Sequence, residues 1–184
     1  MVPYKQKYTF QRKPYKVTIP LMPVVVLQFG SNTGNRLQLI DIAVKQCIDR
    51  IGLCEKISDY YQSPPWGFSS NHAFINCVAS FSTMHRPEEI LAIIQRIEKE
   101  MGRERHGKGY TDRVIDIDLL FYDQLVLKTP DLTIPHPLMA KRRFVLLPLS
   151  QIYPGWLHPG LQITVSSMLQ TCDDDAEVVV YRKA

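Results

Sequence analysis

The sequence predicts an α+β fold: a ferredoxin-like α/β sandwich with a βαββαβ core, an antiparallel sheet and C-terminal additions. Two observations lead to this class. Strand and helix patterns follow one another through Tyr122 in the order strand, helix, strand, strand, helix, strand, which is the split-βαβ arrangement. The 184 residues fit one domain and suffice for a hydrophobic core. We find neither an internal repeat nor an interdomain linker, so we expect a single domain over residues 23–184.

The first three elements follow from hydrophobic patterning. Residues 24–29 form a short β-branched run that ends in a Gly-Ser-Asn turn, which predicts a buried strand. Apolar side chains then recur at helical spacing from Leu37 to Ile51, and we expect Gly52 to end this helix. Residues 56–62 predict a second strand, which leads into a loop rich in proline and glycine.

The next strand and helix carry clearer signals. Residues 73–82 alternate, with one apolar face and a second face that carries Phe74 and Asn76. An aromatic ring that can stack on a flat ligand, beside an amide that can bind the ligand's edge, indicates a small-molecule pocket. The alternative is an aromatic side chain that packs under a loop. Residues 87–101 begin with proline and two glutamates and end before a glycine, which predicts a helix.

The last core strand, residues 113–122, is the most informative segment. Side chains two positions apart point to the same face of a strand, so Asp116 and Asp118 project together while Ile115 and Ile117 point into the core. About 6.6 Å of strand separates the two aspartates, and their carboxylates can converge on one metal ion or on a pair about 3.5–4 Å apart. Such oxygen ligands suit Mg²⁺, which substrate phosphates and waters complete. The alternative is a pair of aspartates on a solvated sheet face.

The loop before this strand is rich in basic residues. Arg103, Arg105 and Arg113 lie beside the two carboxylates in sequence, a combination that suits a polyphosphate. The alternative is an ordinary solvated loop. Residues 102–108 also match the pattern G-x-x-x-x-G-K, but they follow a helix and lack the Ser or Thr that should come next. We therefore reject a nucleotide-binding phosphate loop.

The C-terminal part gives weaker signals. Residues 134–137 are rich in proline and contain His136, which caps a loop or takes part in catalysis. An apolar run covers residues 144–149. We expect a short helix near 164–170 and a strand near 178–181, and these are the additions to the core.

The formal net charge of +4 arises from the start of the chain. Residues 1–22 contain five basic residues and no acid, which leaves 17 basic and 18 acidic residues in the remainder. A nucleic-acid-binding domain carries its basic surface on the domain itself, so we expect no nucleic-acid partner. We interpret residues 1–22 as a basic N-terminal extension.

Cysteine usage and apolar runs bear on the compartment. The four cysteines include no Cys-x-x-Cys pair and no histidine at zinc spacing, so we expect them to stay reduced, with Cys47 and Cys77 buried. No apolar run approaches the length of a membrane span, and the first residues lack the pattern of a secretory signal. The sequence thus predicts a cytoplasmic protein without a membrane partner. We also expect it to be a monomer, although neither observation bears on the oligomeric state.

These residues together resemble the family of 6-hydroxymethyl-7,8-dihydropterin pyrophosphokinases, over about residues 24–158. The motifs that carry the resemblance are Phe29-Gly30-Ser31-Asn32, Tyr61-Gln62-Ser63-Pro64-Pro65-Trp66-Gly67, Phe74-Ile75-Asn76, Gln95-Arg96-Ile97-Glu98, Arg113-Val114-Ile115-Asp116-Ile117-Asp118-Leu119-Leu120, and Ile134-Pro135-His136 followed by Arg142 and Phe144. The family transfers pyrophosphate from ATP to the hydroxymethyl group of the pterin and releases AMP, in folate biosynthesis. The resemblance therefore implies an ATP-dependent diphosphokinase with ATP and the dihydropterin as its partners.

The resemblance also implies roles for individual residues. Asp116 and Asp118 are expected to hold two Mg²⁺ ions bound with ATP, and Arg103 and Arg113 to close over its phosphates. The expected ATP contacts are Gln95, Glu98, Arg105, Arg113, Leu119, His136 and Arg142. The expected pterin contacts are the aromatic pair Phe74 and Phe144, the amide of Asn76 and the hydroxyl of Ser63. The chain departs from the family where tyrosine often replaces Phe74, tryptophan is common near Tyr110, and Gly-Pro often replaces Thr111-Asp112. No general base is indicated.

Two rival classes remain open from the residues alone. A metal-dependent nucleotide-sugar transferase also uses an Asp-x-Asp pair, and it would ignore pterin. A non-enzymatic ferredoxin-like module that binds a regulatory ligand or RNA would carry basic and aromatic residues on its open sheet face, but it gives the aspartate pair no role.

Overall fold

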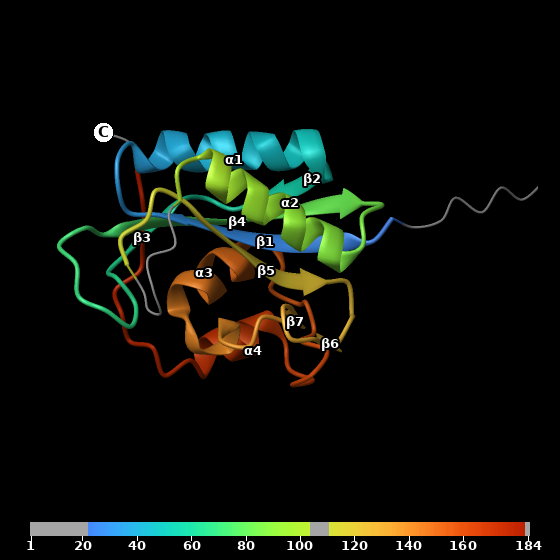
Figure 1. The fold of residues 1–184 in the computed structure, drawn as a ribbon. Coiled ribbons are helices and arrows are strands. Elements are labelled where there is room, and N and C mark those ends of the chain that lie inside the picture. Colours follow the sequence, from blue (N-terminus) through green and yellow to red (C-terminus); the bar gives the residue numbers. More distant parts are fainter. Residues whose placement is uncertain (1–21, 104–110, 183–184) are drawn as a thin grey trace, which may run out of the picture.

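The computed structural model describes residues 22–103 and 111–182 of the chain (Figure 1). The elements are, in chain order, β1 (Val24–Ser31), α1 (Arg36–Arg50), β2 (Gly52–Ile57), β3 (Tyr61–Ser63), β4 (Phe74–Thr83), α2 (Pro87–Glu100), β5 (Asp116–Tyr122), β6 (Leu127–Lys128), β7 (Thr133–Ile134), the 3₁₀ turn η1 (Met139–Lys141), α3 (Arg143–Ile152), α4 (Val165–Gln170) and β8 (Val179–Val180). The prediction of a basic extension concerns residues that lie almost entirely outside this description. None of the helices in the described ranges is long and apolar enough to cross a lipid bilayer.

The main sheet confirms the predicted ferredoxin-like topology. Its strands lie in the order β5-β1-β4-β3-β8, with β2 beside β4 as well, and the pairings are antiparallel. Figure 1 shows α1 and α2 on one face of this sheet and α3 and α4 on the other. The strands β6 and β7 form a separate ribbon. The central strands are therefore covered on both faces, as their apolar sequences require.

The hydrophobic core has one cluster on each face of the sheet. Alternate residues of β1 divide between them, with Val25 and Leu27 toward α1 and α2 and Val26 toward α3 and α4. In β5 a register shift opposite Val26 inserts one residue, so that Leu120 and Phe121 both enter the α3 cluster. The bulge adds apolar side-chain volume on the α3–α4 face of the sheet. In the upstream half of β5, side chains still alternate strictly between the two faces.

The predicted strand over residues 56–62 is wrong in its boundaries, because two shorter strands, β2 and β3, replace it. Ser58 separates them: its backbone N–H donates to Val78 O at 2.9 Å, and its hydroxyl accepts from Val78 N at 3.0 Å. A side-chain oxygen thus replaces a backbone carbonyl of the ladder. Gly52 begins β2 directly after the helix, with φ of +153°, and a Cβ there would lie 2.1 Å from Ser82 O.

Other predictions are confirmed. Helix α1 ends at Arg50 and α2 runs from Pro87 to Glu100, within a residue or two of the expected bounds. Cys47 and Cys77 are fully buried, and all four cysteines are free. The apolar run over 144–149, which the pattern assigns to no element, lies in α3.

Candidate active site

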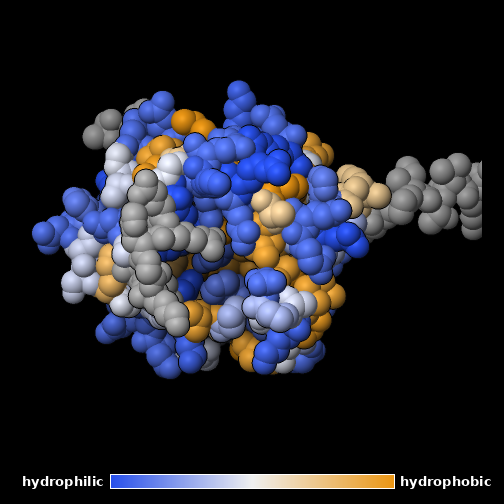
Figure 2. Space-filling view, viewed as in Figure 1, coloured by the Kyte–Doolittle hydropathy of each residue, from blue (hydrophilic) through white to orange (hydrophobic). Residues whose placement is uncertain are grey.

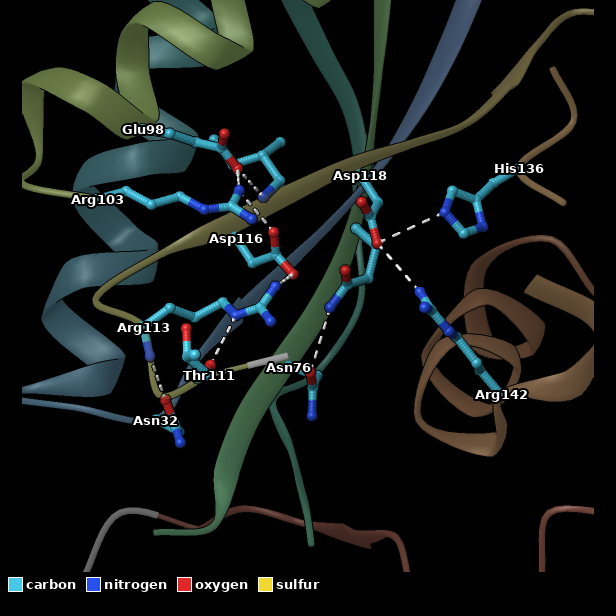
Figure 3. A network of polar contacts seen from close by, with 12 residues as sticks. Asn32, Asn76, Glu98, Arg103, Thr111, Arg113, Asp116, Asp118, His136 and Arg142 are labelled. Carbon is cyan, nitrogen blue, oxygen red and sulfur yellow. Dashed lines mark hydrogen bonds and ion pairs between the residues drawn. The ribbon is translucent and has the colours of Figure 1, made fainter. Parts of the chain in front are cut away.

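Strand β5 presents its two carboxylates on one side, as the strand period predicts. The flanking Ile115 and Ile117 are buried in the core cluster against α1 and α2, while Asp116 and Asp118 face the opposite way. Their side chains are 19% and 26% exposed, so both are partly withdrawn from water. Figure 3 shows that basic side chains from three other segments converge on them.

Asp116 lies between two arginines. Arg103 Nη1 is 2.7 Å from Asp116 Oδ1, and Arg113 Nη1 is 2.5 Å from Asp116 Oδ2. Arg103 also pairs with Glu98, whose Oε1 accepts a hydrogen bond of 2.8 Å from Ile117 N. Glu98 is only 3% exposed. From this buried position its carboxylate binds both the backbone at the start of β5 and the guanidinium of Arg103. The predicted grouping of Arg103, Arg113 and Asp116 is therefore present.

Asp118 has a different environment. Arg142 Nη1 lies 3.3 Å from Asp118 Oδ2, and His136 Nε2 lies 3.9 Å from the same oxygen. Burial, and then the charge of Asp116, raises the pKa of Asp118 to about 7. Burial and the charge of Arg142 lower the pKa of His136 to about 4, so this imidazole is neutral near pH 7. Its Nδ1 accepts from Leu138 N at 3.2 Å, which leaves Nε2 as the protonated nitrogen toward Asp118.

The donor set suits a hard cation that arrives with its own oxygen ligands. Within residues 22–103 and 111–182, no three His, Cys, Asp or Glu side chains gather closely enough to hold a metal ion by themselves. Two adjacent carboxylates without further protein ligands match Mg²⁺, which takes few protein ligands and is completed by phosphates and waters. The surrounding arginines favour the same anionic ligand.

A charged cavity of about 340 Å³ opens beside both carboxylates. In Figure 2 this face of the molecule is hollowed at its centre, below the hydrophilic surface of α1 and α2. The predicted residues Gln95, Glu98 and Leu119 line the cavity, with Arg103 and His136 near the carboxylates. Its remaining walls, which the sequence did not single out, are Leu91, Ile94, Ile117, Pro130, Asp131, Leu132, Thr133 and Pro137. One end is therefore charged and the other mainly apolar.

An aromatic cavity lies on the other side of Asp116. It is lined by Gln28, Gly30, Ser63, Pro64, Trp66, Phe68, Phe74, Asn76, Arg113, Asp116, Arg142 and Phe144. The predicted pterin contacts are thus brought together in one place. Asn76 Nδ2 donates to Ser63 Oγ at 3.0 Å, and Gln28 Nε2 donates to Asn76 Oδ1 at 3.2 Å. These buried bonds fix the orientation of the Asn76 amide.

The aromatic cavity is narrow. Its free volume is about 40 Å³, well below the ~150 Å³ apolar cavity that accommodates benzene. The guanidinium of Arg142 lies 4.7 Å from the ring centroid of Trp66 and 5.7 Å from that of Phe144. Phe68 packs edge-on against Phe74 at 6.2 Å. A flat two-ring ligand can enter only when the segment with Trp66 and Phe68 moves aside.

The sequence missed some residues of this site. Gln28 is the one polar side chain in the apolar run of residues 24–29, a signal that could have marked it. Gly30 leaves little room for a side chain, because a Cβ there would lie 3.1 Å from Gln28 Nε2 and 3.2 Å from Asn76 Oδ1. Asn32 anchors the backbone of Arg113, as described below. Arg105 and Tyr110 lie outside the described residues, so their predicted roles are not placed.

Comparison with known proteins agrees with this geometry. The family model described as 7,8-dihydro-6-hydroxymethylpterin-pyrophosphokinase (HPPK) matches residues 26–154. The chain is 42% identical over 141 residues to the 2-amino-4-hydroxy-6-hydroxymethyldihydropteridine pyrophosphokinase of Porphyromonas gingivalis, covering 75% of this chain and 95% of the relative. It is 40% identical over 138 residues to the enzyme of that name from Aquifex aeolicus, covering 75% and 85%.

A solved structure shares the fold. The Plasmodium falciparum HPPK-DHPS crystallised with pteroate superposes with a TM-score of 0.66 at 16% identity, over 81% of this chain and 42% of that chain. The chain thus spans less than half of that longer protein. With a family model that covers most of its length and with near-full-length relatives above 40% identity, the chain belongs to the HPPK family.

Proposed function

We propose that the chain transfers the pyrophosphoryl group of ATP to the hydroxymethyl group of 6-hydroxymethyl-7,8-dihydropterin, which yields AMP and the pterin pyrophosphate for folate biosynthesis. One observation supports this most directly: Asp116 lines both the charged and the aromatic cavity, with Arg103 on the charged side and Arg113 on the aromatic side. A phosphate chain held at Asp116 therefore adjoins a flat ligand held between the aromatic side chains. Pyrophosphoryl transfer requires this proximity of donor and acceptor.

The charged cavity is assigned to ATP. Its apolar end, with Leu91, Ile94 and Leu119, suits the adenine ring, and Gln95 at its rim can bind the ring's edge. The phosphates then lie toward Asp116, where Arg103 and Arg113 neutralise their charge.

Two Mg²⁺ ions carried with ATP are assigned to Asp116 and Asp118, and they supply charge neutralisation and alignment of the phosphates. In the absence of ATP the cations at these carboxylates are Arg103, Arg113 and Arg142. The same arginines can turn from carboxylate to phosphate without leaving the site. His136, neutral near pH 7, presents its Nε2–H beside Asp118 as a donor to a phosphate oxygen.

The aromatic cavity is assigned to the dihydropterin. Phe74 and Phe144 supply flat apolar surfaces, and Asn76 presents an amide that Ser63 and Gln28 hold in place. A fixed amide recognises the edge of a pterin at little entropic cost. Closure of the segment with Trp66 would exclude water from the acceptor hydroxyl. We assign no general base, because positioning and charge neutralisation carry most of such a transfer.

The decisive assay measures AMP release from ATP with and without added 6-hydroxymethyl-7,8-dihydropterin. Strict dependence on the pterin supports the proposal, and ATP turnover that ignores the pterin contradicts it. Calorimetry with a non-hydrolysable ATP analogue, with and without Mg²⁺, addresses the rival ligand-binding module, which should not need the metal. A nucleotide-sugar transferase would instead bind a nucleotide sugar, and no feature of the described residues favours it.

We further propose that residues 23–184 act as one pyrophosphokinase domain and that the basic segment 1–22 is an accessory extension. The domain is proposed to work as a cytoplasmic monomer without nucleic-acid or membrane partners. Gel filtration with light scattering tests the monomer, and expression of residues 22–184 tests whether the domain is sufficient.

A further inference from the structure

Three segments that are distant in the sequence meet at Asp112, just before β5. Asn32 follows β1, Ser70 and His72 precede β4, and the four residues form what we call the Asp112 cluster. Asn32 Nδ2 donates to Asp112 Oδ1 at 2.6 Å, and His72 Nδ1 lies 3.1 Å from Asp112 Oδ2. The hydroxyl of Ser70 accepts from His72 N at 3.1 Å, and Ser70 also contributes to lowering the pKa of Asp112. The carboxylate of Asp112 therefore joins two loops of the active site.

The cluster also holds the backbone of Arg113. Asn32 is 2% exposed, and its Oδ1 accepts from Arg113 N at 2.7 Å while its own N–H donates to Arg113 O at 3.2 Å. The other end of the same amide, Nδ2, binds Asp112 and reaches His72 O at 3.4 Å. One buried side chain thus fixes Asp112 and Arg113 together, which Figure 3 shows for Asn32 and Arg113. Arg113 in turn reaches Asp116 at 2.5 Å.

The opposite end of the cluster leads to the aromatic cavity. Ser70 and His72 belong to the segment 64–73 between β3 and β4, which also carries Trp66 and Phe68 of that cavity. Hydrogen bonds from Ser70, His72 and Asn32 hold the pKa of Asp112 below its usual value, so the carboxylate is the favoured form. The aromatic segment and the arginine that pairs with Asp116 are therefore connected through one side chain.

We propose that Asp112 is a positioning residue for the transfer reaction: it fixes Arg113 against Asp116 and couples that arginine to the segment that closes over the pterin. This inference rests on the proposed function and adds to it a residue that touches neither substrate. Removing the carboxylate should misplace Arg113 and loosen the aromatic segment together. A role confined to the local structure of an exposed loop would change neither the turnover number nor pterin binding.

The test compares Asp112→Ala, Asp112→Asn and the matched control Asp49→Ala, which removes an exposed carboxylate near the C-terminal end of α1. Asp112→Ala should lower kcat and raise KM for the dihydropterin by about tenfold each, the scale of losing hydrogen bonds to a charged group. Asp112→Asn keeps one acceptor oxygen, so kcat and the KM for the dihydropterin should return most of the way to their wild-type values. Asp49→Ala should match the wild type, and unchanged kcat in Asp112→Ala overturns the proposal.

A double-mutant cycle shows whether Asp112 acts through Arg113. If it does, Asp112→Ala added to Arg113→Ala should cost little more than Arg113→Ala alone, because coupled residues are not additive. Effects that multiply would contradict the proposal and indicate a separate structural role.

Hydrogen exchange separates the failure of this inference from the failure of the proposed function. Asp112→Ala should speed exchange at Arg113 and in the segment 64–73 together, and Asp112→Asn should restore protection, whichever reaction the protein catalyses. If the wild-type protein shows no pterin-dependent AMP release, the proposed function is refuted but the coupling through Asp112 is not. Exchange that rises in neither segment, or in only one of them, would refute the coupling.

Discussion

The aromatic cavity and the charged cavity share Asp116 as a wall, yet their polar groups are satisfied in different ways. In the aromatic cavity, neutral groups hold one another: Gln28 binds Asn76, and Asn76 binds Ser63. In the charged cavity, carboxylates are held by cations that a phosphate would also attract, and burial raises the pKa of Asp118 to about 7. The first arrangement is ready for a neutral ligand, whereas the second must exchange partners when its ligand binds.

The difference teaches where each substrate's binding energy comes from. On the proposed assignment, a pterin needs only that the aromatic segment moves aside, because the amide of Asn76 is already oriented. On the same assignment, ATP with its metal ions displaces existing ion pairs and brings the opposite charges that replace them. Substitutions on the two sides of Asp116 should therefore produce separable effects.

The largest effect is expected at the carboxylates. Asp116→Ala and Asp118→Ala should each lower turnover by about a thousandfold or more, because they remove the metal-binding oxygens that supply several kcal/mol of charge stabilisation. The fold should survive, since both side chains point away from the α1–α2 core. Steady-state AMP release checks turnover, and pterin quenching of Trp66 fluorescence should stay close to wild type. Near-normal rates at low Mg²⁺ would contradict the metal assignment.

A second, smaller effect should differ between the two arginines that pair with Asp116. Arg103 pairs with Glu98 and Asp116 and must turn toward the phosphates, so Arg103→Ala should lower kcat about a hundredfold with little loss of ATP affinity. Arg113 is fixed by Asn32 and Asp116, so Arg113→Ala should affect both kcat and ATP binding. Calorimetric titration with an ATP analogue supplies the affinities. Equal affinity losses in the two variants would remove the distinction.

On the aromatic side, Asn76→Ala should raise KM for the pterin about thirtyfold and leave ATP affinity unchanged. The substitution removes the recognising amide and leaves Gln28 and Ser63 without the partner that orients them, a penalty of about 2 kcal/mol. Ser63→Ala, which removes one supporting bond only, is the matched variant and should cost less. An equal loss of ATP affinity in Asn76→Ala would show that the cavities are not independent.

The smallest effect concerns stability rather than rate. A raised pKa means that ionised Asp118 destabilises the folded protein, and the penalty grows as pH rises from about 4 to its full value above about 7. In the absence of ligand, Asp118→Asn should therefore melt about 5 °C higher than wild type at pH 8. The difference should shrink steadily toward pH 4. A constant difference across this range would show that the burial of Asp118 carries no electrostatic cost.

The sequence predicted much of this site because strand periodicity is strict. The common side of Asp116 and Asp118, the grouping of Phe74 with Asn76 and the order of the core strands all follow from alternation and from the order of the elements. The break at Ser58 could not be predicted, because it depends on a hydroxyl replacing a carbonyl of a distant strand. The choice of ion-pair partners by Arg103 and Arg142 was equally out of reach, since long side chains select partners only in the folded structure.

The position of Glu98 bears on how the enzyme returns to its starting state. Its Oε1 holds both Ile117 N and the guanidinium of Arg103. When Arg103 turns to the phosphates, the bond to β5 persists, and the strand that carries the aspartates keeps its shape. A carboxylate that is 3% exposed then has one cation fewer, which costs free energy in a poorly hydrated position. On the proposed role of Arg103, that cost favours its return to Glu98 once the products leave, which restores the ligand-free arrangement of the site.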